Sequence, residues 1–373
     1  MSSNFKVWIE ISAKALQHNY RVIRSLLKPK TKLFAVVKSN AYGHGLVAFS
    51  KLADRLGVDG FCVDSVVEGV RLREEGIMKT ILVLGPTFKN LLKEAARNDI
   101  TITVSSLEAL KELKASKYHP EFHLKIDTGM HRQGFYVSDL PTLIQKLKTY
   151  QLTNLLTGCY THFASAKDIN YPTFTDEQFD EFQKAIRILE KAGLKNLLRH
   201  AAATGGTLVN QKYHLDAVRI GIGLYGLWPS TELAIQLPKL RLQPVLSWKT
   251  LVSEVKELAP GDFVGYDLVE RVNRKTKMAV LPIGYWHGYP RSLTSVGEVL
   301  ICGKRAKILG RVSMDMIVVD VTGIPAKRGA VAVLLGKNGK ELVDAYELAR
   351  KAAGASYYEL VTRINPLIER VVK

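Results

Sequence analysis

The chain has 373 residues, of which 47% are hydrophobic and 24% charged, close to the average for globular proteins. This composition excludes an intrinsically disordered chain and a collagen-like repeat. The 53 Lys and Arg against 35 Asp and Glu give a formal charge of +18, which permits a nucleic acid or an anionic membrane as partner. Sites that bind single-stranded nucleic acid combine basic residues with aromatic residues on which bases stack. The basic clusters at 271–277 and 304–307 lack interleaved aromatic residues, so we expect a solvated basic surface instead.

The cysteines and the N-terminus bear on the compartment. Cys62, Cys159 and Cys302 are too few and too far apart for a disulfide framework or a zinc cluster, which favours a reducing compartment. The first residues have no apolar core of signal-peptide length, and no window approaches ~18 uninterrupted apolar residues. We expect a soluble, cytoplasmic protein that binds no metal, nucleic acid or membrane.

Short apolar runs alternate with helix-patterned stretches between residues 30 and 226. Most runs are apolar at successive positions, as in parallel strands covered on both faces. Such strand and helix units over about 200 residues predict an α/β fold, a (β/α)8 TIM barrel, with a doubly wound open sheet as the alternative. The eight runs are 33–38, 60–65, 80–85, 101–106, 122–128, 157–163, 197–203 and 216–221.

The pattern changes after Pro229. Strand-like segments separated by turns, and not by long helices, predict a mostly antiparallel β domain, closed by a helix over 341–353. The segment 7–12 alternates like a strand of this second domain. We therefore expect a barrel domain over 13–229 and a β domain over 1–12 and 230–373. The later strand-like segments are 246–258, 278–284, 298–310, 316–321 and 331–336.

In such barrels the active site lies at the carboxyl ends of the strands. Lys38 ends the first run behind four apolar residues, where partial desolvation favours an imine-forming nucleophile, although a strand-end lysine often simply reaches water. The loops 203–207 and 221–223 are short and glycine-rich, as in the phosphate sites of this fold and also in ordinary turns. The combination of a rim lysine with these loops indicates pyridoxal phosphate.

Two further rim residues fit such a cofactor. Arg219 lies within a predicted barrel strand. Burying its charge is unfavourable unless a hydrogen-bond acceptor lies beside it, and the pyridine nitrogen is such an acceptor. His162 ends the sixth run, where it is either a satisfied core histidine or a cofactor contact.

Seven motifs resemble alanine racemase, a fold-type III pyridoxal phosphate enzyme, in order and over essentially the whole chain. The first and the fourth are the most specific. The motifs are VVKSNAYGHG (36–45), KIDTGMHRQG (125–134), YTHFASA (160–166), VRIGIGLYG (218–226), LPIGYWHGYP (281–290), GRVSMD (310–315) and YYELVTRI (357–364).

The resemblance implies a role for each matching residue. Lys38 would hold the cofactor as an imine and act as one base, and Tyr266 would be the second base. Arg132 and the backbone of Met314 would hold the substrate carboxylate, and Lys125, often carbamylated in the family, would anchor Arg132. The implied cofactor contacts are Lys38, Tyr42, His162, Thr204, Arg219, Gly221, Ile222 and Tyr358. The implied entrance residues are Tyr285 and Asp315.

The implied reaction is the interconversion of L-alanine and D-alanine, which supplies D-alanine for peptidoglycan. Racemisation removes a proton from one face of Cα and returns it to the other, so two bases must flank the substrate. In the family Tyr266 reaches the cofactor of the partner subunit, which implies a homodimer with shared active sites. A tyrosine near its ordinary pKa of ~10 needs cationic neighbours to work as a phenolate. A carboxylate at the position of Arg219 would keep the pyridine nitrogen protonated, whereas an arginine disfavours this protonation. Arg219 therefore argues against a decarboxylase of the same fold.

Some positions depart from the family pattern. Ala203 and Thr204 stand where many members have Asn and Ser, and Trp286-His287 stands where Ala-Asp is common. The last change affects the expected entrance, so a broader racemase that accepts serine remains an alternative. A non-catalytic carrier of pyridoxal phosphate is another alternative, although such proteins usually lack the β domain.

Overall fold

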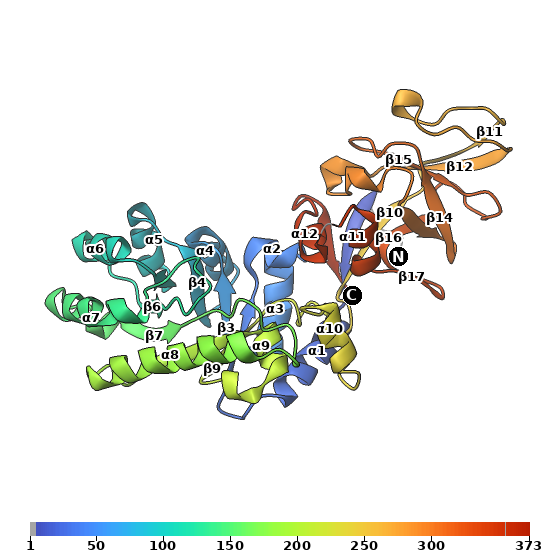
Figure 1. The fold of residues 1–373 in the computed structure, drawn as a ribbon. Coiled ribbons are helices and arrows are strands. Elements are labelled where there is room, and N and C mark those ends of the chain that lie inside the picture. Colours follow the sequence, from blue (N-terminus) through green and yellow to red (C-terminus); the bar gives the residue numbers. More distant parts are fainter. Residues whose placement is uncertain (1–4, 355) are drawn as a thin grey trace. The chain divides into compact units, whose positions relative to one another are not determined.

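The computed structural model describes residues 5–354 and 356–373, which form two compact units (Figure 1). The barrel unit comprises Ala15–Ser39 and Phe49–Gln243. The β unit comprises the chain up to Lys14, Asn40–Ala48 and Pro244–Lys373. The segment Asn40–Ala48 therefore packs with the β unit, although it lies between two barrel strands in the sequence.

Eight parallel strands form a closed barrel in chain order, as predicted. The ring closes where β2 pairs with β9, from Lys32 opposite Ala217 to Ala35 opposite Ile220. Strands β3 and β6 are buried along their whole length, as expected when helices cover the outside and side chains fill the inside. The strands are β2 (Lys32–Val36), β3 (Gly60–Val63), β4 (Thr80–Pro86), β5 (Thr101–Val104), β6 (Phe122–Lys125), β7 (Leu156–Tyr160), β8 (Leu198–Ala203) and β9 (Ala217–Ile220).

Two of the helices between these strands, α4 and α6, are capped by serine. Ser65 and Ser106 each accept a hydrogen bond from a first-turn N–H group, as N-cap residues do. The longest helix, α8, buries Phe179, Phe182 and Leu189 on one face. The helices are α1 (Ala13–Ser25), α3 (Leu46–Leu56), α4 (Val66–Glu74), α5 (Leu92–Arg97), α6 (Leu107–Ala115), α7 (Leu140–Thr149), α8 (Thr173–Lys191), α9 (Thr204–Val209) and α10 (Thr231–Gln236).

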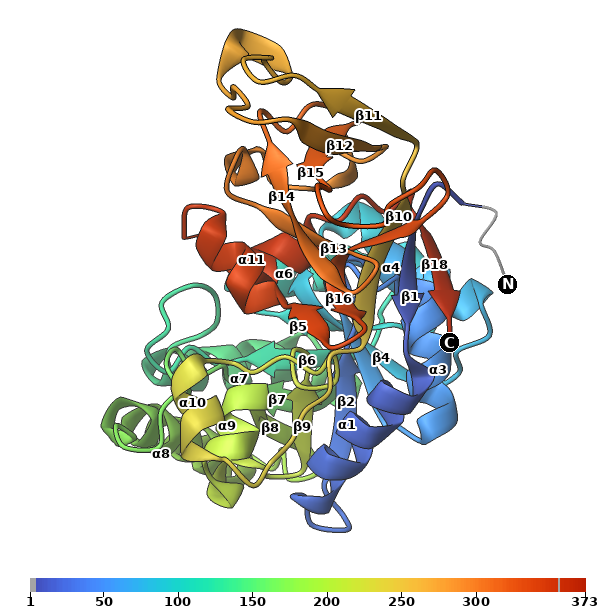
Figure 2. The ribbon, with the colours of Figure 1, turned by 90° about the vertical axis from the view of Figure 1, so that its right-hand side faces the viewer.

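The β unit contains a ten-stranded, mostly antiparallel sheet. The N-terminal strand β1 pairs antiparallel with β10 and parallel with β18, which confirms the prediction for 7–12 (Figure 2). The strand order is β11-β12-β15-β14-β13-β16-β10-β1-β18, and β17 pairs with β16. The strands are β1 (Val7–Ile11), β10 (Leu246–Leu251), β11 (Glu254–Leu258), β12 (Thr276–Leu281), β13 (Glu298–Ile301), β14 (Lys304–Leu309), β15 (Ile317–Asp320), β16 (Val331–Asn338), β17 (Glu341–Val343) and β18 (Glu369–Val372).

Two predicted elements of this unit are corrected. The segment 246–258 forms two strands, because Val252 donates its N–H to Ala330 and Ser253 donates to Val280, so the chain changes pairing partner there. The predicted helix over 341–353 begins with β17, which pairs with β16 in a tight hairpin. The helix itself, α11 (Ala345–Lys351), starts only after Asp344, whose side chain caps it. The helix α12 (Tyr357–Thr362) and the strand β18 were not predicted.

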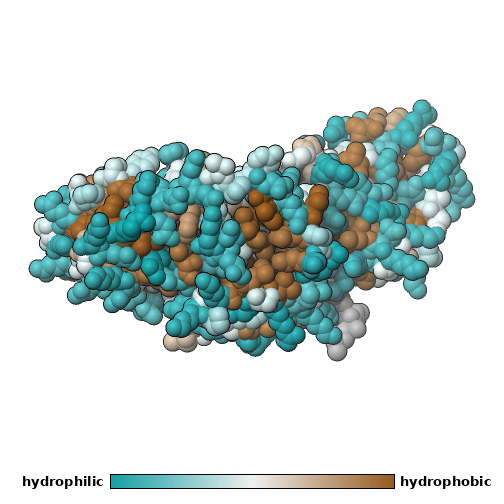
Figure 3. All heavy atoms as spheres, turned by 60° about the horizontal axis from the view of Figure 1, so that its bottom comes forward, coloured by the Kyte–Doolittle hydropathy of each residue, from teal (hydrophilic) through white to brown (hydrophobic). Residues whose placement is uncertain are grey.

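Among the described residues, none of the helices combines the length and the apolar character needed to cross a membrane. The face drawn in Figure 3 is mostly hydrophilic, with separate hydrophobic clusters between polar side chains. Isolated clusters of this kind are usual on folded proteins.

Candidate active site

The first barrel strand leads into a left-handed turn. Ser39, Asn40, Ala41 and Tyr42, which make up all of α2 (Lys38–Tyr42) after its first residue, have φ angles of 56°, 55°, 51° and 51°. A left-handed helical conformation is unfavourable by roughly 1–2 kcal/mol per residue for L-amino acids other than glycine. Strained backbone of this kind persists only where the surroundings enforce it, and it clusters at functional sites. The turn therefore marks the segment after Lys38 as a candidate site.

Lys38 itself is half-exposed. Its ammonium lies 3.5 Å from the Asp64 carboxylate, and its side chain is 37% exposed. This is more exposure than its apolar neighbours in the sequence suggest. The amine is accessible to a cofactor or substrate, as a nucleophile must be.

Arg219, in the middle of β9, is the most enclosed charge at the barrel rim, with 2% exposure. Its Nη1 donates to His200 Nδ1 at 2.6 Å, and its Nη2 donates to the carbonyl oxygens of Thr161 and Ala201 at 2.8 and 2.9 Å. His162 Nδ1 lies 3.2 Å from the same Nη2. Burial lowers the pKa of Arg219, but an arginine remains charged at neutral pH. The Arg219 guanidinium is thus a buried cation whose hydrogen-bond acceptors in the barrel carry no charge.

A pair of buried histidines continues this network. His200 Nε2 lies 2.9 Å from His123 Nδ1. A guanidinium can only donate, so His200 accepts at Nδ1, carries its proton on Nε2 and donates to His123. Burial lowers the pKa of His123 to about 3 and that of His200 well below its usual value, so both are neutral. Sequence reasoning missed both residues, although each stands as a polar residue within a predicted strand.

Lys125 is a second buried cation candidate, 3% exposed at the end of β6. Its ammonium donates to the Ile126 carbonyl at 2.9 Å and lies 5.4 Å from the centre of the Tyr160 ring. Burial, reinforced by the charge of Arg219, lowers the pKa of Lys125 to about 7. A large fraction of this amine is therefore neutral at physiological pH, when it is a nucleophile.

The loop after β6 exposes Arg132 at the rim. Its shape is set by Asp127, whose Oδ1 accepts backbone N–H groups from Gly129, Met130 and His131 at 3.0 to 3.1 Å. Burial acts to raise the pKa of the Asp127 carboxyl, but the hydrogen bonds from Gly129 and His131, together with nearby positive charge, outweigh it, and its pKa is lowered. A charged Asp127 thus fixes the backbone that carries Arg132.

The two glycine-rich loops are joined to each other. Thr204 Oγ1, at the start of α9, accepts from the N–H group of Gly223 at 3.3 Å. A Cβ on Gly223 would lie 2.7 Å from Thr204 Cγ2, so glycine is needed for this approach. Ala203 is the N-cap of α9 and provides no side-chain acceptor for the first turn. The structure therefore brings Thr204 close to the Gly221-Ile222 loop.

The β unit brings two predicted phenols together. The rings of Tyr42 and Tyr358 have centroids 6.3 Å apart, and Tyr358 lies 4.9 Å from Tyr357 on α12. Burial raises the pKa of Tyr358 above its usual range, so this phenol is a hydrogen-bond donor at neutral pH.

The other predicted residues of the β unit are exposed. Tyr266 and Met314 are 69% and 54% exposed. The N–H groups of Tyr285 and Trp286 donate to the carbonyl oxygens of Ser313 and Met314, both at 3.0 Å, so these two predicted segments lie side by side. A Cβ on Gly284 would lie 2.1 Å from the Ser313 carbonyl oxygen, which requires glycine there.

His287, one of the two residues that depart from the family pattern after Tyr285, has a structural role. His287 is buried, its Nδ1 accepts from the Gly284 N–H group at 3.2 Å, and burial lowers its pKa. It lies 4.0 Å from Asp315. A neutral histidine here helps to support the turn that carries Tyr285, while Trp286 is half-exposed.

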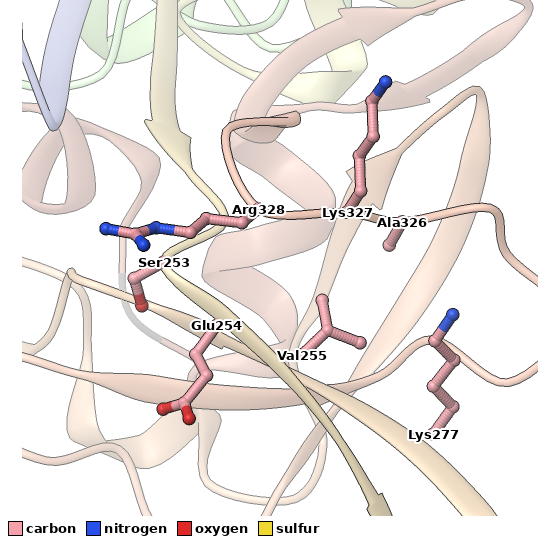
Figure 4. Close-up of a pocket in the computed structure, with 7 residues that line it drawn as sticks. All are labelled: Ser253, Glu254, Val255, Lys277, Ala326, Lys327 and Arg328. Atoms are coloured by element: carbon pink, nitrogen blue, oxygen red, sulfur yellow. The ribbon is translucent and has the colours of Figure 1, made fainter.

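The described residues contain no group of three His, Cys, Asp or Glu placed to hold a metal ion. They do fit pyridoxal phosphate, since they offer an accessible lysine, a buried arginine on neutral acceptors, and hydroxyl groups with glycine-rich backbone for a phosphate. In the β unit a hollow of about 640 Å³, lined by Ser253, Glu254, Lys277 and Arg328 among others, contains none of the predicted residues (Figure 4). In this view Arg328 points away from Lys277 and Lys327, so the three basic groups do not converge on one point.

Comparison with known proteins agrees with this chemistry. The model of the N-terminal domain of alanine racemase matches residues 11–229, and that of the C-terminal domain matches residues 245–372. An alanine racemase of Leptospira interrogans is 36% identical over 100% of this chain and 97% of its own, and one of Methanococcus maripaludis is 38% identical over 98% of each. The crystal structure of alanine racemase from Bacillus anthracis with bound L-Ala-P has a TM-score of 0.92 and 33% identity, and covers 100% of this chain and 96% of its own.

Proposed function

This chain belongs to the alanine racemase family, and we propose that it interconverts L-alanine and D-alanine with pyridoxal phosphate, to supply D-alanine for peptidoglycan. The observation that carries the proposal is Arg219, a buried cation whose acceptors are imidazole and backbone carbonyl groups. Such a group is suited to an uncharged aromatic nitrogen, because it offers a hydrogen bond and no proton.

When bound, pyridoxal phosphate stabilises negative charge that develops at the substrate Cα. Lys38 would hold it covalently, Arg219 would donate to its ring nitrogen, and His162 would lie at its ring. Its phosphate would be bound by hydroxyl groups and glycine-rich backbone, from Tyr42, Thr204, Gly221, Ile222 and Tyr358. The joined loops support this assignment, because Thr204 and the Gly221-Ile222 segment are already held together.

Two bases would move the proton. Lys38 would act on one face of Cα and Tyr266 of the partner subunit on the other. Arg132 and the Met314 backbone would orient the substrate carboxylate, with Tyr285 and Asp315 at the entrance. The cations Arg132 and Arg219 would favour ionisation of a phenol brought near them.

A homodimer would cover the exposed side of the β unit. Leu268 is 64% exposed, and Tyr266 and Met314 are exposed as well. Monomeric proteins rarely expose several large apolar side chains in one region. A second copy of the chain would bury these side chains and complete the site. The buried, unpaired Cys62 and Cys159 are consistent with a cytoplasmic location, which we also propose.

Amino-acid exchange measured in deuterium oxide tests the proposal. Purified protein loaded with pyridoxal phosphate is incubated with L-alanine or L-serine, and Cα exchange and D-isomer formation are followed. We expect both with L-alanine, and neither in Lys38→Ala. Formation of D-serine as well as D-alanine would identify the broader racemase, and cofactor binding without exchange of either amino acid would identify the carrier.

A further inference from the structure

Holding four successive residues in a left-handed conformation requires specific restraints on both sides of the turn Ser39–Tyr42. Within the segment, Gly45 donates its N–H to the Asn40 carbonyl and Leu46 donates to Asn40 Oδ1, both at 2.9 Å. His44, buried and with its pKa lowered to about 4 by burial, is neutral, and its Nδ1 lies 3.0 Å from the Tyr42 carbonyl oxygen. These local bonds close the turn but do not fix it to the rest of the β unit.

Gly43 provides the first external restraint. Its φ is +81°, and a Cβ there would lie 1.8 Å from the carbonyl oxygen of Val361. Since Val361 belongs to α12, the turn packs directly against the helix that carries Tyr358. No residue but glycine permits this approach.

Arg370, in β18, provides the second external restraint. Its Nη2 and Nε donate to the Gly43 carbonyl oxygen at 3.0 and 3.3 Å. Its Nη1 donates to the carbonyl oxygens of Asn365 and Pro366 at 2.8 and 3.0 Å, and also to that of Ile368. One half-buried guanidinium therefore joins the end of the turn to the chain that follows α12.

We propose that Arg370 is a positioning residue, which holds the left-handed turn against α12 and thereby fixes the Tyr42 and Tyr358 phenols at the spacing needed to bind a phosphate-bearing cofactor. This inference rests on the proposed function for the identity of the cofactor. The effect of Arg370 on the phenols passes through the Gly43 carbonyl, one residue from Tyr42.

Three variants separate positioning from general stability. Arg370→Met removes the donors and keeps the bulk, Arg370→Lys restores one donor, and Arg305→Met removes a comparable network elsewhere in the β unit. Arg305 pairs with Glu298, Glu341 and Glu347 at 2.6 to 3.0 Å, so its loss should lower stability without touching the turn. Arg363→Met, at an exposed arginine paired with Glu359, controls for loss of positive charge near α12.

Two readouts are measured on each variant. One is the dissociation constant of pyridoxal phosphate for the cofactor-free protein, and the other is amide hydrogen exchange of the peptide containing Gly45 and Leu46, also without cofactor. For Arg370→Met we expect faster exchange and a dissociation constant raised about tenfold to a hundredfold, the effect of losing hydrogen bonds from a charged donor. Arg370→Lys should recover part of both effects, whereas Arg305→Met and Arg363→Met should leave both unchanged.

An unchanged dissociation constant in Arg370→Met would overturn the inference, whether or not exchange is faster. Equal weakening in Arg305→Met would overturn it as well, because general destabilisation would then explain the result. If Arg370→Met does not fold, the same comparison is made with Arg370→Lys. If the unaltered protein binds no pyridoxal phosphate, the proposed function fails, and the exchange measurement alone decides whether Arg370 holds the turn.

Discussion

The two units carry their candidate active-site residues in opposite ways. In the barrel unit Arg219 and Lys125 are enclosed, and their polar partners come from the same barrel. In the β unit Tyr266 and Met314 are more than half exposed. A buried polar group must be satisfied by its own fold, whereas an exposed group acquires its environment only when something covers it. Changes to the buried polar residues of the barrel should therefore alter stability, and changes at Tyr266 should alter activity alone.

The largest expected effect is on the exposed side. Tyr266→Phe removes the proposed second base, so racemisation should fall roughly 10²- to 10⁴-fold, the usual contribution of a positioned acid or base. The free energy of unfolding should change by less than about 0.5 kcal/mol, as is typical of exposed positions. Initial rates of D-alanine formation and denaturant unfolding measure the two effects.

The matched control is Tyr171→Phe, at an exposed tyrosine of the barrel unit. It should change neither rate nor stability. Full turnover in Tyr266→Phe would refute the assignment of the second base. It would also mean that the exposed tyrosine of the β unit does not contribute to activity, contrary to the comparison between the units.

The next effect concerns the buried histidines of the barrel. The pKa of His123 is lowered to about 3, and those of His162 and His200 lie well below their usual value, in each case chiefly because of burial. At a pH between the lowered native pKa of such a histidine and its unfolded pKa of about 6.5, the unfolded chain binds a proton that the native chain does not. Stability is therefore retained above about pH 6.5 and lost as the pH falls below it. Each such histidine contributes up to about 1.4 kcal/mol per pH unit.

Denaturant unfolding between pH 8 and pH 5 measures this slope. His123→Phe should lower stability at pH 8, because His200 loses its partner, but should also make the slope smaller. His119→Asn, at an exposed position, should leave the slope unchanged. Equal slopes in all three proteins would show that the buried histidines do not control acid stability.

The sequence predicted the parts of this molecule that depend on local periodicity. Runs that are apolar at successive positions identified all eight barrel strands, and Arg219 was noticed because a charge within such a run is conspicuous. The pair of His123 and His200 was missed, because its meaning depends on strands far apart in the chain being neighbours. The left-handed turn was also missed, since Ser39 to Tyr42 contain no glycine, and the contacts made by the next residue, Gly43, come from Arg370, far along the chain. The helix predicted over 341–353 was wrong at its start, because pairing with β16 overrides local helix preference.

A smaller effect is expected at Lys125. With its pKa near 7, a growing fraction of this amine is neutral as the pH rises from 6 to 8, and a neutral amine adds carbon dioxide to form a carbamate with release of a proton. Carbon-13 bicarbonate should therefore give a carbamate resonance that increases over this range and is absent in Lys125→Met. That variant should lose roughly tenfold in kcat/KM, through weaker placement of the substrate by Arg132. No resonance at pH 8 would contradict the modification.

The smallest effect tests whether the two units respond independently. Ser106 caps α6 in the barrel unit, and Asp344 caps α11 in the β unit, through hydrogen bonds to N–H groups at 3.2 and 2.7 Å. Ser106→Ala and Asp344→Ala should each lower stability by about 1 kcal/mol, the usual effect of losing an N-cap. If the units unfold separately, each variant shifts only the hydrogen-exchange protection of its own unit. Equal loss of protection in both units would mean that they unfold as one, and the barrel's buried network would then determine the stability of the β unit as well.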